Sequence, residues 1–233
     1  LNKALREGKI KFNAADAKLV DLPAAESREL DVLSPEQARD FVAAAREDRW
    51  AALWILLLGS GCRPGEALGL RWEDFDGTRI RIQRALVRDR KGEGWGLLKP
   101  KTKKSRRTVP LPSSAIDALR THRRRQAEEK LAAGPDYTDH GLIFADKKGA
   151  PLVWNQVRKG FFDVLTQAQL PRMRPYDLRH TCATLLLAGG VNPKIVSERL
   201  GHTTVTLTLD TYSAVLPGLQ EDATDRLDEL LGG

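Results

Sequence analysis

Residues 61–72 read GCRPGEALGLRW, and this stretch decides where the helices in the first half of the chain end and begin. Gly61 and Pro64 interrupt the apolar helix expected before them, and proline is suited to the first position of a new helix. Arg63 precedes a proline, which restricts it to an extended conformation beside a positively polarised helix N-terminus. Glu66 stands where it can close a capping box. The residues alone leave a phosphate site and an ordinary helix cap equally open.

Periodicity outward from this stretch predicts a mostly helical α+β fold. Apolar residues at helical spacing predict helices over residues 34–49, 50–59, 64–71, 113–131, 153–169, 177–187, 193–200 and 216–231. Alternation at 79–82 and 107–111, separated by a turn at 92–96, predicts a small antiparallel β-sheet. A short buried strand or turn is expected at 142–144. Residues 203–209 are β-branched and alternate, so local propensity favours a strand there.

Composition excludes several classes of protein. The chain has 233 residues, of which 41% are hydrophobic and 30% charged, which excludes a disordered tail or a fibre. No run of eighteen apolar residues occurs, and the N-terminus lacks the pattern of a signal peptide. Cys62 and Cys182 are too few for a disulfide framework and lack the spacing of a zinc site. We therefore expect a cytoplasmic protein with no membrane association and no structural metal.

Positive charge is concentrated in one part of the chain. Residues 78–125 hold sixteen basic and three acidic residues, a net charge of +13, whereas the whole chain carries +7. The last 24 residues hold six acidic residues and one arginine. Such concentration favours a partner with a phosphate backbone, and a merely solvated surface is the alternative.

The densest cations lie in residues 101–107, expected at the tip of a loop between strands. Lys101 is either one more phosphate contact or a proton donor held by phosphates, and spacing does not decide between these roles. The other cations of the loop are candidate DNA-backbone contacts: Lys103, Lys104, Arg106 and Arg107.

A second arginine opens another helix. Arg179 and Tyr176 are three residues apart in its first turn, so they share one face near the N-terminus. For His180 the residues favour an ordinary half-buried histidine over a ligand. A lone tyrosine such as Tyr212 is usually a core or interface residue. Together with His202, however, these residues form a set suited to phosphoryl transfer.

Five separated blocks of this sequence resemble the catalytic domain of tyrosine recombinases, especially phage-type integrases. They are residues 61–72, Lys101-Thr102, DLRHT at 177–181, LGH at 200–202 and DTY at 210–212, in the family's order and spacing. The resemblance covers about residues 34–216. It implies the fold of that catalytic domain, and a helix rather than a strand at 203–209.

The resemblance also implies a role for each candidate residue. Arg63 and Arg179 would hold the non-bridging oxygens of the scissile phosphate, and His202 would donate a hydrogen bond to the same group. Lys101 would protonate the leaving 5′ oxygen. Tyr212 would attack phosphorus to form a 3′-phosphotyrosyl link. Glu66 matches an acidic position that supports the site.

One position departs from the family pattern. The family usually has histidine three residues before its second arginine, where this chain has Tyr176. A phenol can hydrogen-bond a phosphate oxygen or Tyr212, but it is a poor proton acceptor at neutral pH. We expect activity to survive this change.

The implied protein is a bacterial, nucleoid-associated, site-specific DNA recombinase that needs no cofactor or metal. Its alternatives are a type IB topoisomerase-like or resolvase activity and a catalytically silent DNA-binding protein. The implied organisation is the end of a core-binding domain plus linker at 1–33, the catalytic domain at 34–216 and a tail helix at 217–233. Its implied partners are double-stranded DNA, three further copies in a homotetramer on two DNA sites, and accessory DNA-bending proteins. Without DNA we expect mainly monomer.

Overall fold

The computed structural model describes residues 1–13, 30–88, 94–98, 105–212, 224–225, 227–228 and 231–232. It divides the chain into two compact units, Leu1–Leu30 and Asp31–Gly233. The first unit contains one short helix, α1 (Asn2–Arg6), within its described part. The tail helix predicted at 216–231 falls largely outside the described residues, so that prediction remains open.

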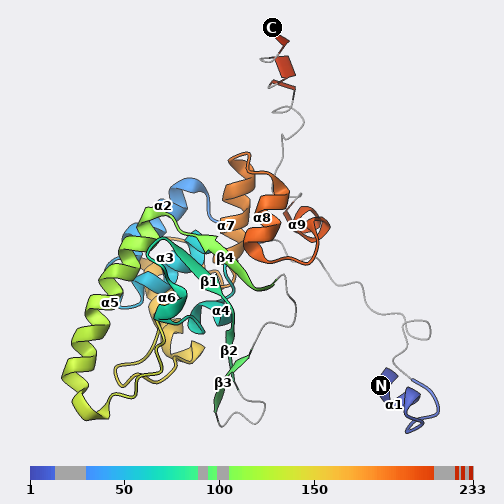
Figure 1. Ribbon diagram of the computed structural model, residues 1–233. Helices are drawn as coiled ribbons and strands as arrows, with labels where there is room; N and C mark the ends of the chain where they lie inside the picture. Colours follow the sequence, from blue (N-terminus) through green and yellow to red (C-terminus); the bar gives the residue numbers. More distant parts are fainter. Residues whose placement is uncertain are drawn as a thin grey trace. The chain divides into compact units, whose positions relative to one another are not determined.

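The core of the second unit is built around α3 (Ala51–Ser60), which is apolar on every side. A helix of this kind is stable only when it is buried all round. It contacts α2 (Pro35–Ala45), α5 (Ser113–Ala133) and α7 (Asp177–Ala188). In Figure 1 it accordingly lies between the long helix α5 and α7. No helix of the described residues is both long and apolar enough to cross a membrane.

The residues that begin α2 and end α3 act as the sequence predicts. Ser34 caps α2 with a reciprocal capping box, in which its hydroxyl accepts from the Gln37 amide and Gln37 accepts from the Ser34 amide. Gly61 ends α3 in the left-handed conformation, with φ of 65°. Helix α4 (Pro64–Leu68) then begins directly, and it is shorter than predicted because Gly69 ends it.

Two antiparallel strand pairs take the place of the small sheet expected. Strand β1 (Arg79–Ile82) pairs with β4 (Arg107–Pro110), with Ile80 opposite Val109. Strand β2 (Ala85–Arg88) pairs with β3 (Trp95–Leu98). The predicted turn at 92–96 is therefore wrong at its end, because β3 already begins at Trp95. The inner faces of β1 and β4 complete the core beside α3 and α5.

The remaining helices are α6 (Trp154–Gln167), α8 (Pro193–Leu200) and α9 (Val205–Tyr212). Figure 1 shows α7, α8 and α9 gathered at one side of the unit, with α8 contacting β4. The strand favoured by local propensity at 203–209 does not form. Helix α9 packs on α8 and buries Thr208 and Tyr212, four residues apart on one helical face, so tertiary packing outweighs the β-branched residues.

Candidate active site

Glu66 is the buried anion at the start of α4. Its side chain is 5% exposed, and it accepts hydrogen bonds from the backbone amide of Arg63 at 2.8 Å and from the Arg63 guanidinium at 3.0 Å. Burial by itself would raise the pKa of Glu66, but the guanidinium of Arg107 and then Arg63 lower it below its ordinary value. The carboxylate is therefore ionised at neutral pH, and it holds Arg63 at the helix start. The capping box and the site expected here are thus one structure.

Arg107 has a different position from the one expected of a DNA-backbone contact on an exposed loop. Its side chain is 7% exposed, and its guanidinium donates to both oxygens of Glu66, at 2.9 and 3.2 Å. Its Nε donates to the carbonyl of Arg199 at 2.6 Å. The reason is strand alternation: Arg107 begins β4 and lies on the same face as the buried Val109, whereas Arg106, the residue before the strand, is exposed. Arg107 ties α4 to the end of α8.

Arg179 lies between the C-terminal ends of two helices. Its side chain is 1% exposed, and it donates to the carbonyl of Gly61 at 2.7 Å and to that of Leu200 at 2.8 Å. Carbonyls at helix C-termini carry the negative end of the helix dipole, so they hold a cation well. Burial, reinforced by the charge of Arg63, lowers the pKa of Arg179, although a guanidinium stays protonated at neutral pH.

Two glycines make this arrangement sterically possible. A Cβ on Gly61 would lie 2.7 Å from Leu200, and a Cβ on Gly201 would lie 2.9 Å from the guanidinium of Arg107. Both glycines also have positive φ, 65° and 68°. The chain therefore needs glycine at both positions, because Gly61 lies against Leu200, Gly201 lies against Arg107, and both have a backbone conformation that favours glycine.

His202 follows α8 directly and is half-buried. Its Nδ1 lies 2.7 Å from the hydroxyl of Thr208, a partner that the sequence did not single out. Burial, and after it the positive charges of Arg179 and Arg63, lowers the pKa of His202 to about 4. The ring is therefore neutral at neutral pH. When its Nδ1 accepts from Thr208, its Nε2 carries the proton and can donate to an anion.

Tyr212 ends α9 with its side chain 1% exposed. Its hydroxyl lies 3.0 Å from Nδ1 of His180, which the sequence favoured as an ordinary histidine. Tyr176, at the start of α7, packs edge-on against the same histidine ring and is 38% exposed. Burial raises the pKa of Tyr212, so its hydroxyl is protonated at neutral pH.

Arg63, Arg107 and Arg179 form what we call the arginine cluster. The positive charges of these arginines act on one another and on His202. The carboxylate of Glu66 is the negative charge that interacts with them. Three guanidinium groups against one buried carboxylate leave a net positive charge, which favours binding of an anion such as a phosphate. Lys101, Lys103 and Lys104 lie outside the described residues, so their predicted roles stay predictions.

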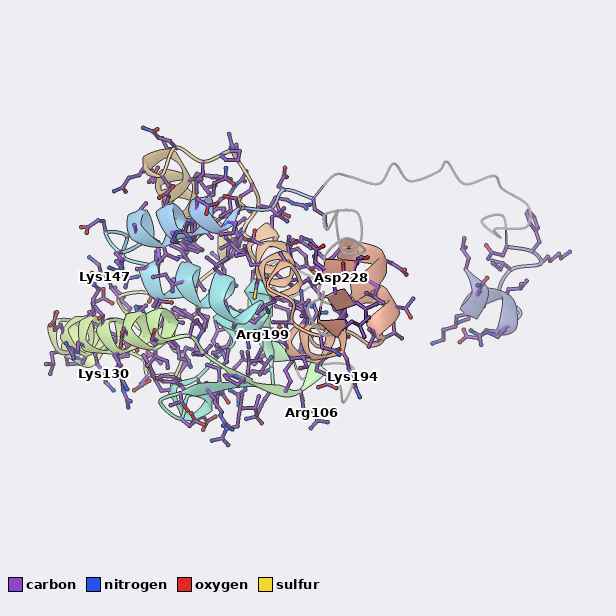
Figure 2. All side chains as sticks on the ribbon, turned by 90° about the horizontal axis from the view of Figure 1, so that it is seen from above. Arg106, Lys130, Lys147, Lys194, Arg199 and Asp228 are labelled. Carbon is purple, nitrogen blue, oxygen red and sulfur yellow. The ribbon has the colours of Figure 1, made fainter. Side chains whose placement is uncertain are left out.

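An exposed basic surface adjoins the cluster. Arg106 and Lys194 are both exposed. Figure 2 shows them on the side of the unit opposite to Lys130, which lies near the C-terminal end of α5. Strand β4, which begins directly after Arg106, and helix α8, which contains Lys194, are in contact. Among the described residues no group of three or more His, Cys, Asp or Glu side chains is arranged to hold a metal ion.

Comparison with known proteins gives a family match over most of the chain. The model of the phage integrase family matches residues 31–217. A tyrosine recombinase XerC-like protein of Caldanaerobacter subterraneus subsp. tengcongensis is 35% identical over 245 residues, covering 98% of this chain and 63% of that protein. An integrase of Saccharopolyspora erythraea is 25% identical, covering 99% and 64%. The chain thus spans less than two thirds of the length of these relatives.

Solved structures share the fold. The integrase of transposon Tn1549 in complex with a circular intermediate DNA superposes with a TM-score of 0.74 at 23% identity, covering 97% of this chain and 75% of that one. XerA recombinase gives a TM-score of 0.66 at 23% identity, covering 91% and 69%. The fold expected from the sequence blocks is confirmed.

Proposed function

Because the chain belongs to the phage integrase family, we propose that it carries the catalytic site of a site-specific DNA recombinase. The enzyme cuts and rejoins DNA through a 3′-phosphotyrosyl intermediate. The observation that supports this most is the electrostatic interaction that links Arg63, Arg179 and His202, together with the action of the Arg179 charge on the buried hydroxyl of Tyr212. Cations hold a phosphate, and a hydroxyl next to them can attack it.

In this proposal each residue has a separate task. Arg63 and Arg179 bind the non-bridging oxygens of the scissile phosphate and stabilise the charge that grows on them during attack. His202 donates a third hydrogen bond from its Nε2. Tyr212 forms the bond to phosphorus, and Lys101 protonates the leaving 5′ oxygen. Glu66 fixes Arg63 by the two contacts described above.

Tyr176 is proposed as a phosphate contact rather than a second nucleophile. It lies one helical turn before Arg179 and remains accessible, whereas Tyr212 is buried. An in-line attack requires one hydroxyl opposite the leaving oxygen, and that position falls to Tyr212.

The test uses the full-length protein and a nicked suicide substrate, which traps the covalent intermediate. Tyr212→Phe should give no covalent product, Tyr176→Phe should retain some, and Tyr176→His should retain at least as much as the unaltered protein. The product should carry a 3′-phosphotyrosine and a free 5′ hydroxyl, and a chelator should leave its yield unchanged. Covalent attachment of Tyr212→Phe would show that another residue is the nucleophile, and loss of product in chelator would overturn the metal-free assignment.

A second assay distinguishes recombination from strand relaxation. Two DNA molecules that both contain the site should exchange strands, whereas a type IB topoisomerase-like enzyme would only relax supercoils. Neither exchange nor covalent trapping would point to a catalytically silent DNA-binding protein.

The assembly and the domain organisation belong to the same proposal. Double-stranded DNA is the partner, residues 1–33 end a core-binding domain and linker, and residues 34–216 form the catalytic domain. We propose a homotetramer on two DNA sites, a mainly monomeric protein without DNA, and DNA-bending accessory proteins in a bacterial nucleoid. The acidic residues of the last 24 positions support a tail, 217–233, that docks on a basic neighbour. A stable tetramer in sizing experiments without DNA would contradict this assembly.

A further inference from the structure

The hydroxyl of Tyr212 has one hydrogen-bond partner among the residues the structure describes, and it is a histidine outside the set assigned above. The oxygen lies 3.0 Å from Nδ1 of His180, with the two ring centroids 5.7 Å apart. The ring of Tyr176 also packs against the ring of His180, with the two centroids 5.2 Å apart. Of these two side chains near the start of α7, His180 is therefore the one within hydrogen-bond reach of the nucleophile.

The geometry of α7 explains how one short segment serves two purposes. Consecutive residues of a helix project about 100° apart. Arg179 extends between the ends of α3 and α8, toward the arginine cluster. His180, one position later, is turned toward α9 and meets Tyr212. Helix α7 thus supplies both a phosphate-binding cation and a partner for the nucleophile.

We propose that His180 is a further catalytic residue, which accepts the proton of Tyr212 as the tyrosine oxygen attacks phosphorus. The inference rests on the function proposed above. The bond from Tyr212 Oη to phosphorus forms while the bond from phosphorus to the 5′ oxygen breaks. The proton of the hydroxyl passes to Nδ1 of His180, and the leaving 5′ oxygen takes a proton from Lys101. Rejoining reverses both transfers.

The protonation states in the resting site suit this step. Burial lowers the pKa of His180, an effect that Asp177 opposes and Arg179 and Arg174 reinforce. The ring is therefore neutral at neutral pH and has a free acceptor nitrogen. The hydroxyl, whose pKa burial raises, does not ionise unaided. Transfer becomes favourable only when the oxygen begins to bond to phosphorus, because that bond acidifies the hydroxyl.

The test compares two suicide substrates with the full-length protein. One has the normal 5′ oxygen at the scissile phosphate, and the other has a bridging sulfur, whose thiolate leaves without needing a proton. Since Lys101 acts on the leaving group, the sulfur substrate should restore cleavage by Lys101→Ala. His180→Asn keeps a polar group of similar shape but cannot take a proton, so cleavage should fall about 10²–10⁴-fold on both substrates.

A pH profile separates proton transfer from a purely structural role. The groups that titrate or carry charge around His180 are Asp177, Arg174, Arg179, Tyr176, His202 and Tyr212. In His180→Asn the rate should rise about tenfold per pH unit in the alkaline range, since only the tyrosinate can then attack. The unaltered enzyme should instead reach a plateau.

Controls keep the two proposals distinguishable. His140→Asn alters a histidine that packs on Trp95, away from the site, and should cleave normally. His180→Asn should melt and bind DNA like the unaltered protein. His180→Ala, which opens a cavity at the ring, should regain activity when imidazole is added. If the unaltered protein forms no covalent product, or Tyr212→Phe does, the proposed function fails.

Three results would overturn the role of His180 while leaving the proposed function standing. They are cleavage by His180→Asn within about tenfold of the unaltered rate, rescue of that variant by the sulfur substrate, and a pH profile unchanged by the substitution. A tenfold or larger loss with none of these features would support it.

Discussion

Two buried polar regions of the second unit have histidines of lowered pKa, yet only one has the features of a reaction site. The first is the arginine cluster with His202. The second, which we call the α5 polar cluster, consists of His122, Gln126 and Trp72. His122 donates to the carbonyl of Ile143 at 2.8 Å, and Trp72 donates to Gln126 at 2.6 Å.

The two regions differ in how far their positive charges are neutralised by carboxylates. In the α5 polar cluster burial lowers the pKa of His122, but the nearby charge of Arg49 is answered by its bidentate ion pair with Glu129. In the arginine cluster several cations share one carboxylate. A perturbed histidine alone does not identify a functional site. Unbalanced positive charge that the protein keeps buried does, because it costs folding energy unless a ligand uses it.

The largest effect expected in this comparison is on stability. Arg107→Met removes the cation that holds both oxygens of Glu66, so the free energy of unfolding should fall by about 3–5 kcal/mol. Denaturant titration measures it, and Arg106→Met, at the exposed residue just before the same strand, should change stability by less than about 0.5 kcal/mol.

The stability deficit of Arg107→Met, which is its loss of unfolding free energy relative to the unaltered protein, should become smaller in acid. In the unaltered protein the pKa of Glu66 is lowered by folding, so its contribution is present above the ordinary value of 4.5 and is lost as pH falls toward the folded value. Without Arg107 the carboxylate has less to lose on protonation. A deficit that stayed constant as the pH was lowered from 7 to well below 4.5 would contradict the ion pair.

Arg179→Gln should affect catalysis rather than stability. It removes one buried cation from a crowded positive region but keeps an amide donor for the carbonyls of Gly61 and Leu200. Covalent cleavage should fall about 10²–10³-fold, as when one charge-stabilising donor is lost. Cleavage kinetics and a melting curve on the same sample would test this, and a large drop in melting temperature with normal cleavage would refute it.

His122→Ala should give the opposite result. It breaks a buried hydrogen bond and ring contacts, so the free energy of unfolding should fall by about 1–3 kcal/mol. Cleavage per folded molecule should be unchanged, since the α5 polar cluster takes no part in the reaction. If fully folded His122→Ala cleaved DNA tenfold more slowly than the unaltered protein, the α5 polar cluster would also be needed for the reaction and the two regions would not differ in this respect.

His202 should contribute to acid sensitivity. Folding lowers the pKa of His202 from 6.5 to about 4, so between these values the unfolded chain binds the proton more tightly. The contribution to stability is complete above pH 6.5 and is lost as pH falls toward 4. Between pH 7 and pH 5, His202→Asn should therefore lose less free energy of unfolding than the unaltered protein does. Urea titrations at each pH measure this loss, and His140→Asn serves as the control that should behave like the unaltered protein. Parallel losses would refute the shift.

The smallest effect concerns the exposed surface. Arg106→Ala should lower the slope of log affinity for duplex DNA against log salt by about 1, with little dependence on sequence. Equilibrium binding across a salt series measures the slope. Lys130→Ala, at the far end of α5, serves as the control. An equal change of slope for both variants would show that Arg106 does not contact DNA more than other exposed cations do.

Local chemistry made much of the fold predictable. The capping residues Ser34 and Pro64 and the helix-ending Gly61 and Gly201 act within a few residues, so their effects can be derived from neighbours alone. The apolar run of α3 likewise predicts a central helix. Family resemblance, rather than propensity, predicted the helix α9, because the residues of that segment favour a strand in isolation.

The sequence by itself indicated most of the helices, the two strands that pair as β1 and β4, and the residues from which a phosphate site could be made. Only the tertiary structure decided that Arg107 faces inward to Glu66, that Thr208 holds His202, and that Tyr212 meets His180. Each of these contacts joins residues from different elements and depends on packing between them. Periodicity identifies which face of an element is buried, but the partner it finds there depends on how α4, β4, α7, α8 and α9 pack together.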